Sequence, residues 1–351
     1  MGEKNLEERR TVMKYREKLQ LRFIIALATS VVLFLPLFAF AGGTNNEPNG
    51  VEDYLIGIAP PPDATPVGTF AGKVYLQWYH AGKLMNNSGN KSTLARDGVS
   101  MDKLNVYVDA NRVFYVSPVK VQVGDFTGFL GAHAIFPLVK PNLHLDVLTP
   151  GGPIDVEGSH SGLADVTFGP AFSWHHKSGL FHFITALDFV APTGQYNAKN
   201  LVNVGNNVWT IAPGFLWSWF PWFYPNIDIS GRFFYSFNTK NDDFSAIPGV
   251  NYHKTPGQEL VLDYDIMHAL WAGKPGMQSR AGIGGYWYHQ TTKDTSNQPL
   301  FTDHLGYTFA IGPALMFDYK SWIFSAHVYW EVATANRPEG VASSLTILCK
   351  F

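Results

Sequence analysis

Residues 305–319 read LGYTFAIGPALMFDY, and the alternation in this stretch decides the fold class. Every second residue from Leu305 to Tyr319 is large or apolar, whereas the residues between them are small or polar. A two-residue period with one large apolar face predicts a β-strand. In a soluble sandwich that face packs inward. In a membrane barrel it faces lipid, and tyrosines near both ends, such as Tyr307 and Tyr319, lie at the two interfaces.

The same period recurs along the chain and predicts twelve strands. None of these segments shows the three-to-four spacing of an amphipathic helix. The predicted strands cover residues 70–81, 103–116, 124–136, 164–176, 181–191, 207–219, 227–239, 258–271, 279–290, 304–318, 322–334 and 342–351.

The connections between these predicted strands alternate in length. Those after the second, fourth, sixth, eighth and tenth strands are short, as at Ser117-Pro118 and 177–179, whereas most of the others run about a dozen residues or more. Outer-membrane barrels have short periplasmic turns, long outer loops and an even number of strands. The sequence therefore predicts an all-β, antiparallel transmembrane barrel over residues 70–351 in the bacterial outer membrane.

Composition agrees with a membrane barrel. Charged residues make up 15% of the chain, against about 25% in ordinary soluble domains. Aromatic residues also make up 15%, and 33 glycines are present, which suits alternating strands with aromatic girdles. Cys349 is the only cysteine, which excludes an intramolecular disulfide and a multi-thiolate metal site.

The end of the chain supplies a second membrane signal. Leu345, Ile347, Cys349 and Phe351 share one side of the last predicted strand. A carboxy-terminal aromatic residue that closes such a strand resembles the signal by which outer-membrane barrels are recognised for assembly. We therefore expect Phe351 to be an assembly signal, with the barrel-assembly machinery and outer-membrane lipids as partners.

The amino end predicts export. Residues 1–22 contain seven lysines and arginines, and an apolar run over 23–41 ends in A-F-A. This pattern predicts a signal peptide over residues 1–41, with Met1 or Met13 as its start. An uncleaved membrane anchor is the alternative, but Pro36 and the A-x-A ending favour cleavage after Ala41.

The predicted mature chain is mildly acidic. Removing residues 1–41 takes away seven basic and four acidic residues, which leaves 19 basic against 24 acidic and a net charge of −5. This balance gives no reason to expect a nucleic acid as partner. The Pro- and Gly-rich segment 42–69 is either a periplasmic tail or a plug inside the barrel.

Polar residues on the inner faces of the strands are predicted to line the lumen. Both signs of charge occur among them, which suggests a narrow path lined by paired charges and aromatic rings rather than an ion-selective pore. Alternatively, these charges only satisfy one another inside a filled small barrel. The predicted lumen residues are Asp109, His133, Asp188, Arg232, Glu259, Asp263, Asp265, Arg280, Tyr286, Tyr288, His327 and Glu331, accompanied by Lys73, Gln77 and Phe234.

Three prolines stand in the middle of predicted strands. Pro170, Pro213 and Pro313 all fall on the apolar face of even-numbered strands. Because proline cannot donate to the ladder, we expect each to mark a bulge that bends the wall. The alternative is that a weakened ladder opens a lateral exit for apolar molecules.

No catalytic constellation stands out. The sequence contains no G-x-S-x-G, no H-E-x-x-H and no glycine-rich phosphate loop. We therefore expect no cofactor, no metal and no enzymatic activity, although a barrel lipid hydrolase with a surface Ser/His pair remains the rival. Several histidines and acids resemble metal ligands, but we expect them to be solvated loop residues: His144, Asp146, Asp155, Glu157, His160, His175 and His176.

Particular motifs carry a family resemblance over residues 54–351. They are G-L-A-D-V-T-F-G-P at 162–170, P-T-G-Q-Y at 192–196, N-V-G-N-N-V-W at 203–209, G-Q-E at 257–259 and G-Y-W-Y-H-Q at 285–290. This set resembles outer-membrane proteins described as involved in the meta-pathway of phenol degradation. His289 departs from the pattern, because tyrosine is more usual there.

The resemblance implies an outer-membrane channel that passively admits small hydrophobic, aromatic or phenol-like compounds. The alternative is a structural or surface-binding barrel with a closed lumen. A loop motif at the outer end of the fifth and sixth strands serves either loop architecture, which we favour, or substrate gating. Its residues are Pro192, Thr193, Gly194, Tyr196, Asn203, Gly205 and Asn207.

Overall fold

The computed structural model describes Gly68 and residues 70–149, 151–224, 226–244, 252–272, 277–297 and 305–350. The predicted signal peptide, nearly all of segment 42–69 and the predicted assembly signal at Phe351 lie outside the described residues.

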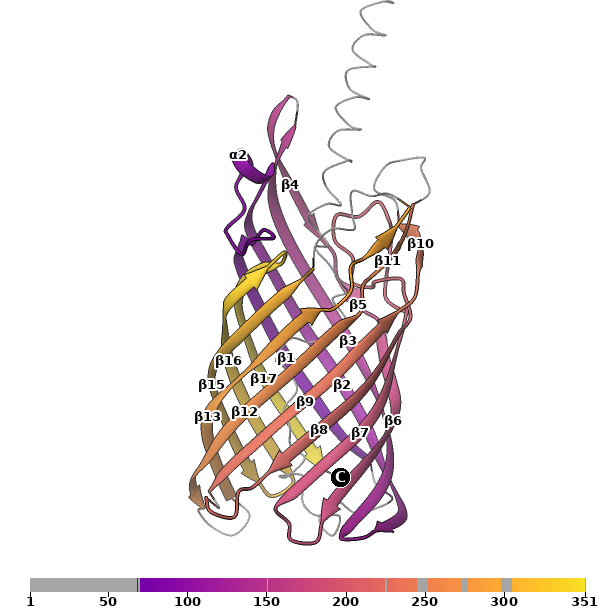
Figure 1. Ribbon diagram of the computed structural model, residues 1–351, viewed down its shortest axis with the longest axis vertical. Helices are drawn as coiled ribbons and strands as arrows, with labels where there is room; N and C mark the ends of the chain where they lie inside the picture. The colour runs from indigo at the N-terminus through magenta and orange to yellow at the C-terminus, as the bar shows by residue number, and fades with distance from the viewer. Residues whose placement is uncertain are drawn as a thin grey trace, which may run out of the picture.

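Twelve antiparallel strands form a closed barrel, as predicted (Figure 1). The strands tilt across the barrel wall, and every strand pairs with two neighbours. The barrel strands are β1 (Phe70–Leu84), β2 (Val99–Val123), β3 (Phe126–Thr149), β6 (Val166–His176), β7 (Phe181–Ala191), β8 (Thr210–Trp219), β9 (Ile227–Asn238), β12 (Glu259–Ala272), β13 (Met277–Gln290), β15 (Tyr307–Tyr319), β16 (Trp322–Ala335) and β17 (Pro338–Lys350).

The first and last strands close the barrel. β1 pairs with both β2 and β17, and the β2–β3 pair completes the ring. Closure matters because lipid offers no hydrogen bonds to an open strand edge. Among the described residues, no helix is long and apolar enough to cross a membrane.

The two ends of the barrel differ in their connections. Tight turns, such as Gly124-Asp125 and Lys320-Ser321, lie at the end near the carboxy terminus (Figure 1). Longer connections lie at the other end, with the exception of the two-residue link Asn336-Arg337 between β16 and β17. By the usual asymmetry of outer-membrane barrels, the end with tight turns is periplasmic and the other is extracellular.

The turn predicted at Ser117-Pro118 was wrong. β2 continues past it to Val123, and the turn falls at Gly124, whose φ is 55°. The β2–β3 register shifts between Val116 and Lys120, so the proline sits in a bulge where no ladder bond is required.

The long loop predicted after the third strand is partly a hairpin. β3 runs to Thr149 and pairs with β4 (Gly152–Ser159), and the short β5 (Gly162–Leu163) pairs with β3 below it. The inner face of this extension is apolar: Leu145 and Val147 are fully buried in a cluster with residues of β1 and β2. These contacts hold the hairpin above the barrel wall (Figure 1).

The remaining described elements lie at the same extracellular end. A one-turn helix, α2 (Leu94–Asp97), lies in the β1–β2 connection. A small three-stranded sheet joins two other connections: β10 (Asn241–Phe244) and β11 (Tyr252–Thr255) lie between β9 and β12, and β14 (Thr295–Ser296) lies between β13 and β15.

The side chains alternate across the wall as the sequence predicts. On β15, Leu315 is 56% exposed on the outer face, while Ala310 and Ala314 are buried on the inner face. Small inner residues leave room in the lumen, and large outer residues cover the wall with apolar surface for lipid.

Bulges at the three wall prolines were predicted, and this was wrong. On the β6–β7 pair, Phe168 faces Phe189 and Ala171 faces Ala186, so the register is the same on both sides of Pro170. The equivalent pairs around Pro213 and Pro313 also keep their register. Each proline therefore interrupts one ladder without shifting its register, and all three face outward, as predicted.

Candidate functional site: the barrel lumen

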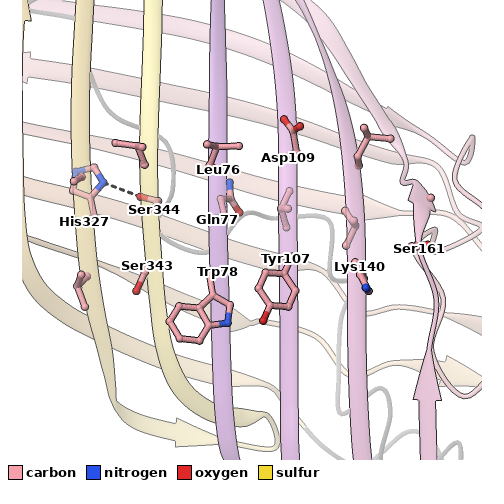
Figure 2. Close-up of a pocket in the computed structure, with 17 residues that line it drawn as sticks. Leu76, Gln77, Trp78, Tyr107, Asp109, Lys140, Ser161, His327, Ser343 and Ser344 are labelled. Carbon is pink, nitrogen blue, oxygen red and sulfur yellow. Dashed lines mark hydrogen bonds between the residues drawn. The ribbon is translucent and has the colours of Figure 1, made fainter.

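A cavity of about 780 Å³ runs along the inner face of neighbouring strands (Figure 2). Its lining comes from β16, β17, β1, β2, β3 and the β5 segment, which are successive neighbours in the wall. The middle residue on each strand belongs to one row of cross-strand partners: His327, Ser344, Gln77, Val108 and Val139. A concave surface shared by this many adjacent strands is the inside of the barrel.

The cavity is polar on one side and aliphatic on the other. His327 Nδ1 lies 3.2 Å from Ser344 Oγ, and Gln77 is the next inward residue along the row (Figure 2). Val108 and Val139 continue the row with hydrocarbon only. A small molecule in the cavity therefore meets hydrogen-bonding groups and an apolar wall at the same level.

The aliphatic side extends along β2 and β3. Ala110 is buried beside Tyr75, and Val108 and Ile135 pack against this pair. This part of the inner wall is thus aliphatic and borders the Tyr75 ring, over which Lys73 Nζ lies at 4.5 Å from the ring centre.

Asp109 was predicted to face the lumen, and this was wrong. Its cross-strand partners Leu76 and Leu138 lie on the outer face, so its carboxylate does too, where it accepts a 3.0 Å hydrogen bond from Asn111 Nδ2. The prediction assumed that polar residues always point inward. β2 breaks this rule because its apolar residues form the aliphatic inner wall.

Glu331 stands at the centre of a hydrogen-bonded cluster nearer the extracellular end. Tyr286 donates to Oε1 at 2.8 Å, while Tyr79 at 2.8 Å and the amide of Gly340 at 2.6 Å both donate to Oε2. The carboxylate is buried, so these donors replace the water that it would otherwise bind. Sequence reasoning missed Tyr79, although it shares the inward parity of Gln77.

A second carboxylate lies beside this cluster. Tyr288 donates a 2.9 Å hydrogen bond to Glu259 Oε1, and the Arg337 guanidinium lies 4.1 Å from the centre of the Tyr288 ring. Glu259, Tyr286 and Tyr288 are all 0–1% exposed. The structure thus brings together four predicted lumen residues, and Arg337 joins them from the β16–β17 link.

Charged pairs occupy the lumen across β9, β12 and β13. Arg232 Nε lies 2.9 Å from Asp263 Oδ2, with both side chains buried. Arg280 lies 3.8 Å from Asp228, an inward residue that the sequence analysis omitted although it shares the parity of Arg232. Asp265 is inward on the same strand as Asp263.

His133 and Asp188 form a separate inward pair. His133 Nε2 lies 2.9 Å from Asp188 Oδ1, joining β3 to β7 across β6. Apart from Asp109, every predicted lumen residue therefore faces inward. Their role in passing a solute stays a prediction.

The predicted loop motif forms a compact clamp at the extracellular end. Asp165 accepts hydrogen bonds from the amides of Gly194 at 2.9 Å and Asn206 at 2.8 Å. Gly194 and Gly205 pack backbone to backbone: a Cβ on Gly205 would lie 2.7 Å from the Gly194 carbonyl carbon. Burial raises the pKa of Asp165, and the hydrogen bonds from Asn206 and Gly194 partly oppose that shift.

Other motif residues also hold the loop together. Thr193 Oγ1 accepts a hydrogen bond from the amide of Val166 at 2.9 Å, and Asn203 Oδ1 accepts one from the amide of Asn197 at 2.9 Å. Asn207 adopts a φ of 57°. Pro192 precedes this clamp, and Tyr196 reaches the carbonyl of Asp243 at 3.4 Å. These contacts agree with a role in loop architecture, and a role in substrate gating stays a prediction.

Comparison with solved structures supports the barrel assignment. The chain is similar to the COG4313 outer-membrane channel from Pseudomonas putida F1, with 16% identity, a TM-score of 0.59, and coverage of 83% of this chain and 99% of that one. A Pseudomonas aeruginosa FadL homologue matches with 10% identity and a TM-score of 0.37, covering 88% of this chain and 96% of that one. The first of these two matches shows that the fold is that of a bacterial outer-membrane β-barrel. No match was found among curated proteins.

A family model described as "Putative MetA-pathway of phenol degradation" matches residues 81–347. This match spans about three quarters of the chain, from β1 to β17. It includes all five sequence motifs that carried the family resemblance. The chain therefore belongs to this family of outer-membrane barrels.

Proposed function

We propose that the protein is a channel that passively admits small hydrophobic compounds, in particular aromatic, phenol-like ones. The observation that supports this most is the lumen cavity with its two kinds of wall. An aromatic ring is stabilised when it leaves water for the apolar surface of Val108 and Val139. A phenolic hydroxyl next to Gln77 or Ser344 keeps a hydrogen-bonding partner.

Passive flow needs no cofactor, and the proposed partners are the solutes, outer-membrane lipids and the assembly machinery.

The cluster around Glu331 and Glu259 would act as a polar constriction between the mouth and the cavity. Tyr286 and Tyr288 are buried, so a passing solute would have to displace their hydrogen bonds to Glu331 and Glu259. A phenolic hydroxyl can replace such a bond, whereas an alkane cannot. This constriction would favour phenols over unsubstituted hydrocarbons.

The test is solute entry into liposomes that contain the mature protein. Phenol entry is compared with that of a small sugar and of chloride salts. We expect faster entry of phenol than of sugar or salt. The variant Val108→Thr/Val139→Thr keeps side-chain shape but makes the aliphatic wall polar, and should slow phenol entry several-fold. Val190→Thr, a buried inward residue of β7 outside the cavity lining, is the matched control and should leave entry unchanged.

Equal entry of sugar and salt would instead indicate a general pore. The close burial of Glu259, Tyr286 and Tyr288 favours a second candidate, a structural barrel with a closed lumen. Absence of any flux would support that candidate.

The lipid-hydrolase rival requires a Ser/His pair at the outer surface, whereas the His327–Ser344 pair faces the lumen. Release of fatty acids from outer-membrane lipids by the purified protein would revive that rival.

A further inference from the structure

The outward face of the β3–β4 hairpin gathers four side chains of the types that bind metals. His144 lies directly opposite Glu157 in the register, and Asp146 lies directly opposite Asp155. Residues two apart on a strand share a face. The two pairs are therefore adjacent on one surface, above the barrel wall.

Three of these side chains already converge. His144 Nδ1 lies 3.0 Å from Glu157 Oε1. One ligand atom from each of His144, Asp155 and Glu157 lies within 4.8 Å of the other two. Zinc ligands stand about 2 Å from the metal, so rotation about side-chain bonds is enough to bring these atoms around one ion.

The backbone beneath the group is well held. Leu145 and Val147 alternate with His144 and Asp146 on β3, and both are buried in the apolar cluster behind the hairpin. This packing fixes the Cα positions of the outward residues. A site built on a packed strand pair loses less conformational entropy on binding than one on a mobile loop.

Three carboxylates share this face with His144, and the nearest basic residue in the register is the exposed Lys103, opposite His144 on β2. Asp146 and Asp155 are like charges in directly opposed positions, an arrangement that destabilises a strand pair. Ser100 Oγ supplies Asp146 with only a long hydrogen bond of 3.4 Å. A bound cation would turn this repulsion into attraction.

We propose that this face of the hairpin binds a divalent cation of the zinc class. The ligands are His144 Nδ1 and the carboxylates of Asp155 and Glu157, with Asp146 as an additional carboxylate beside them. An imidazole among carboxylates suits Zn²⁺, whereas Ca²⁺ and Mg²⁺ prefer oxygen ligands alone. Bound there, the ion links β4 to β3 on the side exposed to the medium.

His144, Asp146, Asp155 and Glu157 were predicted to be solvated loop residues. The spacing alone hides the site, because His144 and Glu157 are brought together only by the hairpin, and β4 was not predicted. Once the hairpin is known, the register places both pairs on one face.

The test is Zn²⁺ binding by the full-length protein in detergent, measured by competition with a chromophoric chelator. We expect one site per chain in the wild type. His144→Ala and Glu157→Gln should each weaken it at least tenfold. His160→Ala is the matched control, because His160 is another histidine at this end of the barrel, bonded to Gln195 at 2.9 Å and outside the group. It should bind Zn²⁺ as the wild type does.

Two further measurements separate the outcomes. Unchanged mobility of the unboiled variants on SDS gels confirms that each barrel is folded. Zn²⁺ should slow proteolysis of the hairpin in the wild type and not in His144→Ala. The proposal is overturned if the wild type retains no Zn²⁺, or if His144→Ala binds it undiminished. Equal displacement of Zn²⁺ by Ca²⁺ would also overturn it, since that result indicates a nonspecific acidic patch.

Discussion

Glu331 shows how one side chain can join distant parts of the barrel. Its carboxylate takes donors from Tyr79 on β1, Tyr286 on β13 and Gly340 on β17. Three donors aimed at one buried charge are favourable only while the charge is present. The cluster is therefore sensitive to a change that keeps the shape of Glu331 and removes its charge.

Glu331→Gln should lower the free energy of unfolding by about 1–3 kcal/mol, because the amide group directs its own hydrogens toward donors. Urea unfolding in detergent, followed by tryptophan fluorescence, measures this change. Glu339→Gln is the control, since Glu339 forms an ion pair with the exposed Lys83, and such a pair should contribute little. Equal stability of both variants would contradict the role of the cluster.

Asp109 presents the opposite case, a carboxylate on the outer wall. Replacing it with leucine should stabilise the barrel in a bilayer, because a charge on the lipid face costs free energy. The unfolding midpoint in lipid vesicles should rise. Asp188→Leu should lower it, since that change removes the partner of buried His133. A drop for Asp109→Leu would show that the outer carboxylate has a partner in the membrane.

At the scale of elements, the Asp165 clamp ties the start of β6 to the long connection between β7 and β8. The clamp lies outside the strands of the barrel, so the Asp165 carboxyl can exchange protons with the medium. The pKa of Asp165 is raised above the ordinary value of 3.8, chiefly by burial. A raised pKa in the folded state means that the protonated form is favoured there.

The resulting contribution to stability is complete below pH 3.8 and is lost as the pH rises through the raised pKa. Asp165→Asn stays neutral, so its stability relative to the wild type should improve as the pH rises through this window. Unfolding midpoints of both proteins across that range test the sign. The reverse trend would mean that the amide donors of Gly194 and Asn206 outweigh burial.

The wall prolines interrupt three hairpin ladders without changing their register. Replacing Pro170, Pro213 and Pro313 with valine should add donors to those ladders and raise the thermal stability. We expect phenol entry into liposomes to stay unchanged. A fall in phenol entry with constant salt entry would instead support the lateral exit through a weakened wall.

The strands were predictable because lipid and lumen impose a strict two-residue period, as at Leu315 and Ala314. The β3–β4 hairpin was missed because its period serves an apolar cluster above the barrel, and the prediction treated that stretch as a loop. Asp109 was misplaced because alternation gives two faces and does not say which one is inside. The clamp motif was found in sequence, yet the contact between Gly194 and Gly205 required the structure.

At the scale of the whole molecule, the barrel combines a uniform outside with an uneven inside. Apolar side chains cover most of the outer wall, while the lumen is aliphatic beside Val108 and Val139 on β2 and β3 and charged on β9 and β12. Closure by β1 and β17 holds these unlike surfaces face to face. Flux and binding experiments therefore report on the intact ring, and no single hairpin can stand in for it.

The β3–β4 hairpin rises well beyond the ends of β16 and β17 (Figure 1). Its tip lies between Thr149 and Gly152, far from the lumen contacts described above. A short peptide tag inserted there should bind antibody on intact, unpermeabilised cells, and a tag at the Gly124-Asp125 turn should bind only after the cells are opened. The reverse result would invert the orientation of the barrel. Among the described residues, the hairpin is thus the segment that reaches furthest from the barrel wall, and its tip offers an accessible place for an affinity reagent.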